Sequence, residues 1–239
     1  METVLIVGAT GNIGTAAAKG ALSAGRNVLA VVRNSASADK LFQNLGTKDR
    51  ITTIEADILS ENGVQSVVHK VKEGKLPAFQ HVYAAAGGAY GTTALKDVTM
   101  EEMRKTMRIN FETNFAAYCA TIPYLLEQNN PNSTWTLCTG SQGELGKRAT
   151  PAITQGALFS MAVAACQELT GSNIRFNEVL LNGLVEVDRN AERSGVMKAS
   201  DFAKNYEAIL GRPDINGCRI RVDGYKDLTE LKYTRKLNL

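Results

Sequence analysis

The chain of 239 residues contains few of the side chains that build metal sites or disulfide frameworks. None of its four cysteines is part of a CxxC pair; they are Cys119, Cys138, Cys166 and Cys218. Isolated cysteines of this kind indicate reduced thiols and exclude a zinc framework. The two histidines, His69 and His81, fall in a helical pattern and in a buried-looking strand. We therefore expect no metal site and no Ser–His–Asp arrangement.

The chain also lacks a large excess of one charge and any long apolar run. The chain has 27 Lys and Arg against 24 Asp and Glu, and a net charge of +3 is too small to favour nucleic acid or a membrane surface as a partner. We find no secretory signal and no apolar run of the ~18 residues that a membrane-spanning helix needs. We therefore expect a cytoplasmic protein, and we interpret the basic stretch from Lys232 to Lys236 as a solvated terminus.

The first strand pattern ends in three regularly spaced glycines. Val4 to Val7 form an apolar run, and Gly8, Gly11 and Gly14 precede an alanine-rich helical pattern. Strand, glycine-rich turn and helix are the layout that holds a dinucleotide pyrophosphate at a helix N-terminus. The alternative is a tight strand–helix turn in another α/β protein. The predicted cofactor contacts in this turn are Gly8, Thr10, Gly11, Asn12, Ile13 and Gly14.

Strand and helix patterns alternate along the chain. Strands are predicted at 3–7, 27–32, 51–56, 79–84, 134–139, 173–181 and 218–222. Helices are predicted at 12–24, 37–45, 64–72, 99–128, 151–169 and 199–210. This order predicts an α/β fold, a Rossmann-type doubly wound parallel sheet, in a single domain over residues 1–239 with a lid at about 184–198. Ligands of such sheets lie at the carboxyl ends of the strands, so the segments that follow the strands should meet in one crevice.

Arg33 closes the second predicted strand, where NAD-specific proteins carry an acidic residue. An arginine there can pair with the 2′-phosphate of NADP, so NADP(H) is favoured over NAD(H), although Arg33 could also simply cover a loop. Asp57 follows the third strand and either accepts a hydrogen bond from adenine or caps the next turn. The predicted cofactor contacts are completed by Ile58, Ala85, Ala86 and Gly87.

Several motifs, in the right order, resemble the short-chain dehydrogenase/reductase superfamily over nearly the whole chain. Residues 8–14 have the GxxGxxG spacing of its extended and atypical branches, and Val31–Asn34 is similar to NmrA-like NADP binders. From the fourth strand on, the chain resembles the standard branch. The matching segments are Ala84–Gly87 for its NNAG motif, Arg108–Phe111 for its helix-four asparagine, Asn173–Val179 for its sixth strand and Ile220–Gly224 for its C-terminal VDG.

The resemblance implies catalysis by an Asn, a Ser, a Tyr and a Lys, and the chain departs from this set. Asn110 matches the asparagine, but the tyrosine position falls on Ile153 and the lysine position on Ala157. An isoleucine cannot transfer a proton, and an alanine cannot hold ribose hydroxyls. The serine position falls on Gly140 or, after a shift of one residue, on Ser141.

Tyr90, in the loop after the fourth strand, is a possible replacement acid; its other interpretation is a surface or lid aromatic. The candidate catalytic residues are therefore Asn110, Ser141 and Tyr90.

Three functions fit this pattern. We favour an NADP(H)-dependent oxidoreductase that acts on a small molecule without the usual Ser, Tyr and Lys. The alternatives are a non-catalytic, NmrA-like NADP(H)-binding regulator and a non-redox isomerase, dehydratase or cyclase on the same fold. By resemblance, the helices predicted at 99–128 and 151–169 pair between subunits, so a homodimer or homotetramer is expected; they could instead be used within one subunit.

Overall fold

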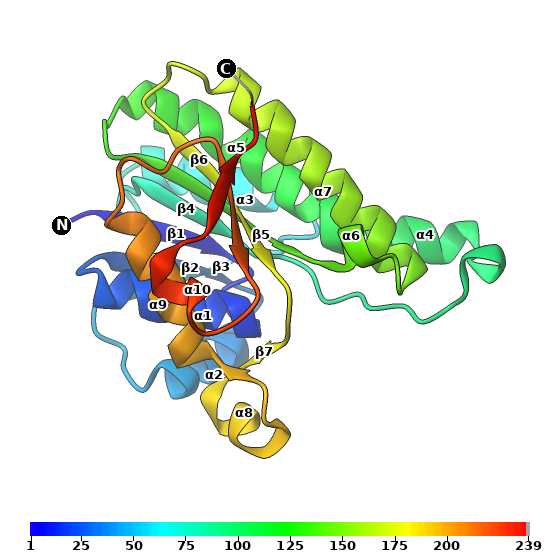
Figure 1. Cartoon of the computed structure of the whole chain (residues 1–239). Coiled ribbons are helices and arrows are strands. Elements are labelled where there is room, and N and C mark those ends of the chain that lie inside the picture. The colour runs from blue at the N-terminus through cyan, green and yellow to red at the C-terminus, as the bar shows by residue number, and fades with distance from the viewer. Residues whose placement is uncertain (238–239) are drawn as a thin grey trace.

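A mostly parallel sheet, in the strand order β10-β9-β6-β5-β4-β1-β2-β3, forms the centre of the computed structural model, which describes residues 1–237 (Figure 1). Its strands are β1 (Thr3–Val7), β2 (Asn27–Val32), β3 (Ile51–Glu55), β4 (His81–Ala84), β5 (Thr134–Gly140), β6 (Arg175–Leu181), β9 (Cys218–Val222) and β10 (Tyr233–Arg235). A separate small sheet pairs β7 (Val185–Glu186) with β8 (Met197–Lys198) inside the predicted lid. The predicted α/β fold is confirmed.

Helices cover both faces of the sheet. They are α1 (Asn12–Ser23), α2 (Ser35–Leu45), α3 (Gly63–Lys72), α4 (Met100–Met107), α5 (Thr113–Gln128), α6 (Gln142–Leu145), α7 (Ala149–Glu168), α8 (Asp188–Ser194), α9 (Ala199–Leu210) and α10 (Asp227–Glu230). One buried cluster joins α1, α2 and α9 to one face, and a second joins α3, α5 and α7 to the other. Every residue of β1 is buried, which explains why this strand is an uninterrupted apolar run.

The strand order changes direction at β1. Leu5 of β1 lies opposite Leu29 of β2 on one side and opposite Val82 of β4 on the other. The glycine turn therefore leaves β1 at the point where the two halves of the sheet diverge. In open α/β sheets this is where ligands bind.

The C-terminal basic stretch, predicted to be a solvated terminus, is largely exposed but forms a strand that was not predicted. Tyr233–Arg235 forms β10, which pairs antiparallel with β9 and extends the sheet (Figure 1). The side chain of Lys236 is only 5% exposed, because it forms an ion pair with the buried Glu178. The alternation of strands and helices gave no signal for this strand, since it follows β9 without a long crossover helix.

The long helix predicted at 99–128 begins as expected but is interrupted. The Thr99 hydroxyl caps the helix by accepting a hydrogen bond from the Glu102 N–H at 3.1 Å. A π-helical turn at Arg108–Glu112 then separates α4 from α5. This turn contains Asn110, and such π turns are frequent at functional sites. The segment between the strand and the helix predicted at 134–139 and 151–169 is also partly helical, because α6 begins at Gln142.

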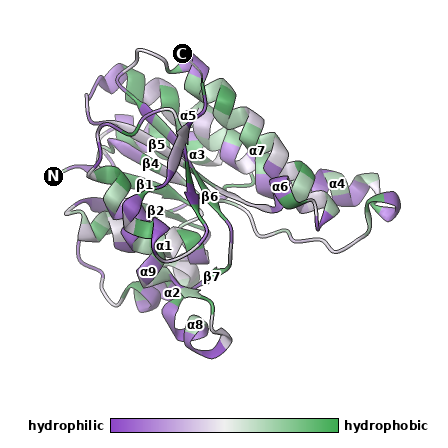
Figure 2. Cartoon of the chain, in the orientation of Figure 1, coloured by the Kyte–Doolittle hydropathy of each residue, from purple (hydrophilic) through white to green (hydrophobic). Residues whose placement is uncertain are grey.

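By length and composition, α7 is the one helix among residues 1–237 that could cross a membrane, with a mean hydropathy of 1.3. Length and composition alone do not make a helix span a membrane, because core helices of globular proteins share them. Figure 2 shows apolar residues along α5 and α7, where both helices lie against the sheet. Leu158 and Ala162 of α7 are fully buried there, as in the core helix of a globular protein.

Candidate functional site

The glycine turn is shaped by close backbone contacts. Gly8 has a φ of +86°, and a Cβ on this residue would lie 2.8 Å from the carbonyl oxygen of Ala85. A Cβ on Gly14 would lie 2.1 Å from the carbonyl oxygen of Gly8, so the helix can approach the turn only with glycine there. Gly11 is exposed, and no side chain caps the first turn of α1. The helix N-terminus and its free N–H groups therefore face outward at the carboxyl end of β1.

Asn12 contacts the predicted lid rather than its own helix. The N–H of Val187 donates to the Asn12 Oδ1 at 3.3 Å. Two turns further along α1, the Lys19 ammonium lies 3.6 Å from the Asp188 carboxylate. The segment that contains β7, α8 and β8 is thus docked on the helix that begins at the glycine turn.

Arg33 and Asp57 follow neighbouring parallel strands, β2 and β3, at the same edge of the sheet. Arg33 is exposed and forms no ion pair within the described residues. The Asp57 Oδ1 accepts a hydrogen bond from the Leu59 N–H at 3.0 Å, so Asp57 does stabilise the next turn. Its neighbour Ile58 is partly buried.

Two asparagines on one face of the α4–α5 segment hold the loop after β4. The Asn114 side chain accepts from the Ala86 N–H at 3.2 Å and donates to the Ala86 carbonyl at 2.8 Å. The Asn110 side chain makes the same pair with Ala89, at 3.2 and 3.0 Å. Sequence reasoning missed Asn114, although its spacing of four residues from Asn110 places both amides on one helix face.

On the side of the site formed by α7, an amide and a hydroxyl side chain make hydrogen bonds with neighbouring elements. The Gly140 N–H donates to the Gln155 Oε1 at 2.7 Å, and Asn110 donates to the Thr154 hydroxyl at 3.2 Å. Ile153 is 45% exposed and Ala157 is partly exposed. The Asn110 amide is therefore occupied by protein partners, and Gln155, which sequence reasoning missed, holds the end of β5.

The other two catalytic candidates lie in different surroundings. Ser141 is 8% exposed and its N–H donates to the Leu181 carbonyl at 3.0 Å, which fixes the start of α6 beside the end of β6. Tyr90 is 64% exposed. The pKa of Tyr90 is raised above its ordinary value, mainly by burial and to a smaller extent by the Cys138 thiol.

A buried ion cluster, also missed, joins β5 and β6 to the last two strands. Glu178 of β6 is fully buried; it accepts from the Thr139 hydroxyl at 2.7 Å and from Arg219 Nε at 3.0 Å, and it pairs with Lys236. Arg219 also donates to Glu144 of α6 at 2.9 Å. The sequence did contain a sign of this cluster, namely a glutamate within an otherwise apolar strand. A carboxylate buried in this way requires a positively charged or hydrogen-bonding partner.

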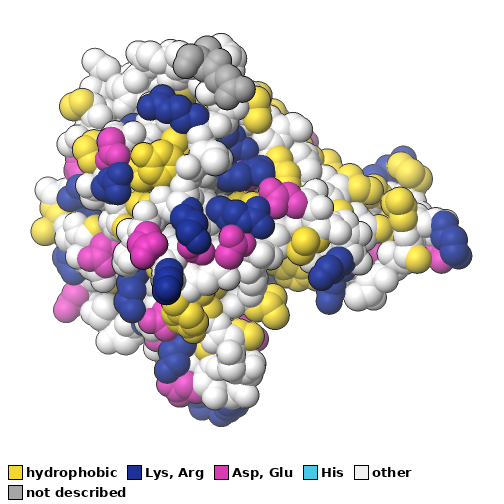
Figure 3. Space-filling model, viewed as in Figure 1, with side chains coloured by type: hydrophobic (Ala, Val, Ile, Leu, Met, Phe, Trp, Pro, Cys, Tyr) yellow, Lys and Arg dark blue, Asp and Glu magenta, His cyan; other side chains and the backbone are white. Residues whose placement is uncertain are grey.

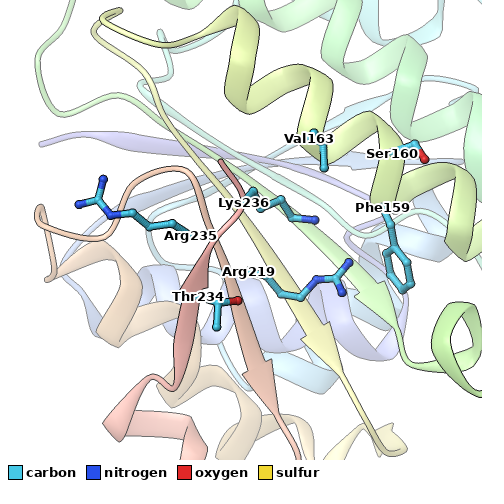
Figure 4. Close-up of a pocket in the computed structure, with 7 residues that line it drawn as sticks. All are labelled: Phe159, Ser160, Val163, Arg219, Thr234, Arg235 and Lys236. Carbon is cyan, nitrogen blue, oxygen red and sulfur yellow. The ribbon is translucent and has the colours of Figure 1, made fainter. Parts of the chain in front are cut away.

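A cavity of about 330 Å³ lies over this cluster, between α7 and β10. In Figure 4, Lys236, Arg219 and Phe159 surround the cavity, whereas the side chain of Arg235 points away from it. The Arg219 guanidinium lies 4.2 Å from the centre of the Phe159 ring. Lys and Arg side chains alternate with Asp and Glu on this face of the molecule (Figure 3). Since carboxylates already neutralise Arg219 and Lys236, the cavity is not an obvious anion site.

Known proteins resemble the chain in both sequence and structure. The profile described as short chain dehydrogenase matches residues 2–195. The short-chain dehydrogenase/reductase iacG of Pestalotiopsis fici is 53% identical over 240 residues, which cover 98% of this chain and 96% of that protein. A short-chain type dehydrogenase/reductase from Mycobacterium ulcerans has a TM-score of 0.80 at 21% identity, covering 95% of this chain and 90% of that one. ElxO, solved with NADP bound, has a TM-score of 0.74 at 16% identity, covering 85% and 88%.

Proposed function

The chain belongs to the short-chain dehydrogenase family, and we propose that it is an NADP(H)-dependent oxidoreductase that acts on a small molecule without the usual serine, tyrosine and lysine. The glycine turn carries this proposal. A Cβ on Gly14 would lie 2.1 Å from a backbone oxygen, so the turn requires glycine where α1 meets β1. Such a turn leaves space and N–H groups for a pyrophosphate.

The residues around the turn fit a dinucleotide. Gly11 and the N–H groups of Asn12 and Ile13 would hold the pyrophosphate, and Thr10 lies in the same turn. Arg33 would hold the 2′-phosphate, and Asp57 and Ile58 the adenine end. Ala85, Ala86 and Gly87 would line the path toward the nicotinamide, on a loop that Asn114 holds in place. When bound, the nicotinamide donates or accepts a hydride; the chain positions it and excludes competing reactions.

The choice of NADP(H) is tested by titrating the protein with NADPH and NADH and following ligand fluorescence. A charge-assisted hydrogen bond contributes about 1.5–3 kcal/mol, so we expect Arg33→Ala to weaken NADPH binding by roughly 10- to 100-fold. NADH binding should change by less than about twofold, because NADH has no 2′-phosphate. Arg104→Ala, which removes an exposed arginine from α4, is the matched control. Tighter binding of NADH than of NADPH to the wild type would contradict the proposal.

A non-catalytic, NADP(H)-binding regulator is the second candidate. It is favoured by the contacts of Asn110 and Gln155, because protein groups occupy amides that could otherwise serve a substrate. A panel of aldehydes, ketones, imines and activated alkenes, assayed by NADPH oxidation, separates the two. Turnover of any acceptor supports the enzyme. Tight NADPH binding, unequal affinities for NADP+ and NADPH and no turnover would support the regulator.

A further inference from the structure

The loop that carries Tyr90 is held on both sides of this residue. Before it, the Asn110 amide binds both main-chain groups of Ala89. After it, Gly91 packs so closely that a Cβ would lie 2.7 Å from the Glu102 Oε1 and 2.8 Å from the Thr150 Oγ1. The backbone at Tyr90 is therefore held by the two bonds of Asn110 to Ala89 and by a 3.5 Å hydrogen bond from Arg148 to the Tyr90 carbonyl.

Tyr90 lies in the loop that leaves the carboxyl end of β4. Arg148, just before α7, donates a hydrogen bond to the Tyr90 carbonyl at 3.5 Å and so ties this loop to the start of α7. Burial raises the pKa of the Tyr90 hydroxyl most, the Cys138 thiol adds to the rise, and Arg148 opposes it. With 64% of its surface exposed, Tyr90 is also accessible to a ligand.

We propose that Tyr90 is the proton donor of this site, in place of the tyrosine that the family has where this chain has Ile153, and that Asn110 is its positioning residue. This inference rests on the proposed oxidoreductase function. During reduction of a carbonyl, a hydride from the reduced nicotinamide forms the new C–H bond, and the C=O π electrons move to oxygen. That oxygen takes the proton from Tyr90 Oη, and the resulting phenolate takes a proton from water on its open side.

The groups around Tyr90 leave its hydroxyl protonated. Arg148, in the segment before α7, donates to the Tyr90 carbonyl at 3.5 Å, and Glu102 of α4 lies near Gly91. A phenol of ordinary pKa is already protonated at neutral pH, as a donor in the reductive direction must be, and burial, which raises the pKa of Tyr90, makes it a weaker acid than an ordinary tyrosine. Asn110 has no free polar atom for the proton transfer itself, but its two bonds to Ala89 set the position of the adjacent Tyr90.

The test compares Tyr90→Phe with Tyr225→Phe, which removes the hydroxyl of another exposed tyrosine, near the C-terminus. Tyrosinate absorbance is titrated with and without saturating NADP+, and NADPH affinity is measured on the same samples. We expect NADP+ to lower the pKa of one phenol in the wild type and in Tyr225→Phe, because the nicotinamide ring of NADP+ is positive. This change should be absent in Tyr90→Phe, although the cofactor still binds. With an acceptor that the wild type reduces, Tyr90→Phe should lower kcat by about 100-fold or more.

The outcomes separate the two proposals. If no nicotinamide cofactor binds, the proposed function fails and Tyr90 has no role. If NADP+ binds and the titrations of wild type and Tyr90→Phe change equally, only the inference on Tyr90 is overturned. Asn110→Ala should remove the NADP+-dependent change while the tyrosine is still present and NADPH still binds, which separates a loss of the position of Tyr90 from a loss of the cofactor site. If Asn110→Ala does not fold, Asn110→Asp keeps the bond from the Ala89 N–H, removes the donor to the Ala89 carbonyl and should weaken the same change.

Discussion

His81 provides a quantitative prediction for the stability of the fold. This side chain is 1% exposed on β4, with Nε2 3.2 Å from the Glu2 carboxylate and Nδ1 3.0 Å from the Thr134 hydroxyl. A carboxylate can only accept, so Nε2 carries the proton and Nδ1 accepts from the hydroxyl in the neutral form. Burial lowers the pKa of His81 from 6.5 to about 4, although its hydrogen bond to Glu2 acts in the opposite direction.

The sign of the effect follows from which state binds the proton. Between pH 6.5 and about 4 the unfolded chain protonates this histidine while the folded protein does not, so stability falls as the pH is lowered. At about 1.4 kcal/mol per pKa unit, the loss reaches about 3 kcal/mol by pH 4 and then levels off. Above pH 6.5 His81 is neutral in both states and contributes no pH dependence.

The assay is urea unfolding from pH 7 down to pH 4, followed by the fluorescence of Trp135, the only tryptophan and fully buried. His81→Gln keeps polar atoms for Glu2 and Thr134 but cannot titrate. We expect the wild type to lose about 3 kcal/mol more over this pH range than the variant loses. His69→Gln, at an exposed position of α3, controls for the loss of a histidine. Equal pH dependence in wild type and His81→Gln would refute the reasoning, whatever their stability at pH 7.

Two further predictions concern the ion cluster and the assembly. Glu178→Gln leaves Arg219 and Lys236 without their buried carboxylate, so we expect it to lower the free energy of unfolding by roughly 3 kcal/mol in urea titrations. Glu144→Gln, at the partly exposed end of the cluster, should cost less than about 1 kcal/mol; equal costs would contradict a buried cluster. Phe115 is 47% exposed on α5. If α5 pairs between subunits, light scattering should show a homodimer or homotetramer that Phe115→Glu dissociates; a monomeric wild type would exclude this pairing.

The parts of the fold that depend on local sterics could be predicted from the sequence. The strand β1, the glycine turn and α1 follow from short-range apolar and glycine spacing, and their bounds agree with the prediction to within a residue. The strand β10 was missed because its three exposed residues have no apolar pattern and it depends on pairing with β9. The clamp by Asn114 and the contact of Asn12 with the lid were missed for a related reason. Each joins segments whose proximity follows from the tertiary fold.

Side chains of the α4–α5 segment and of α7 hold a backbone frame around the site. Main-chain groups withdrawn from water need partners whatever chemistry the site performs, so Asn110, Asn114 and Gln155 are required by the fold itself. A new donor can act with useful precision only if this frame also fixes its position. Tyr90 meets that condition, because the residue before it is held by two hydrogen bonds from Asn110. On our proposal that Ile153 stands where the family has its proton donor, the loop after β4 is where a replacement acid is best placed, since α7 holds the end of β5 through Gln155.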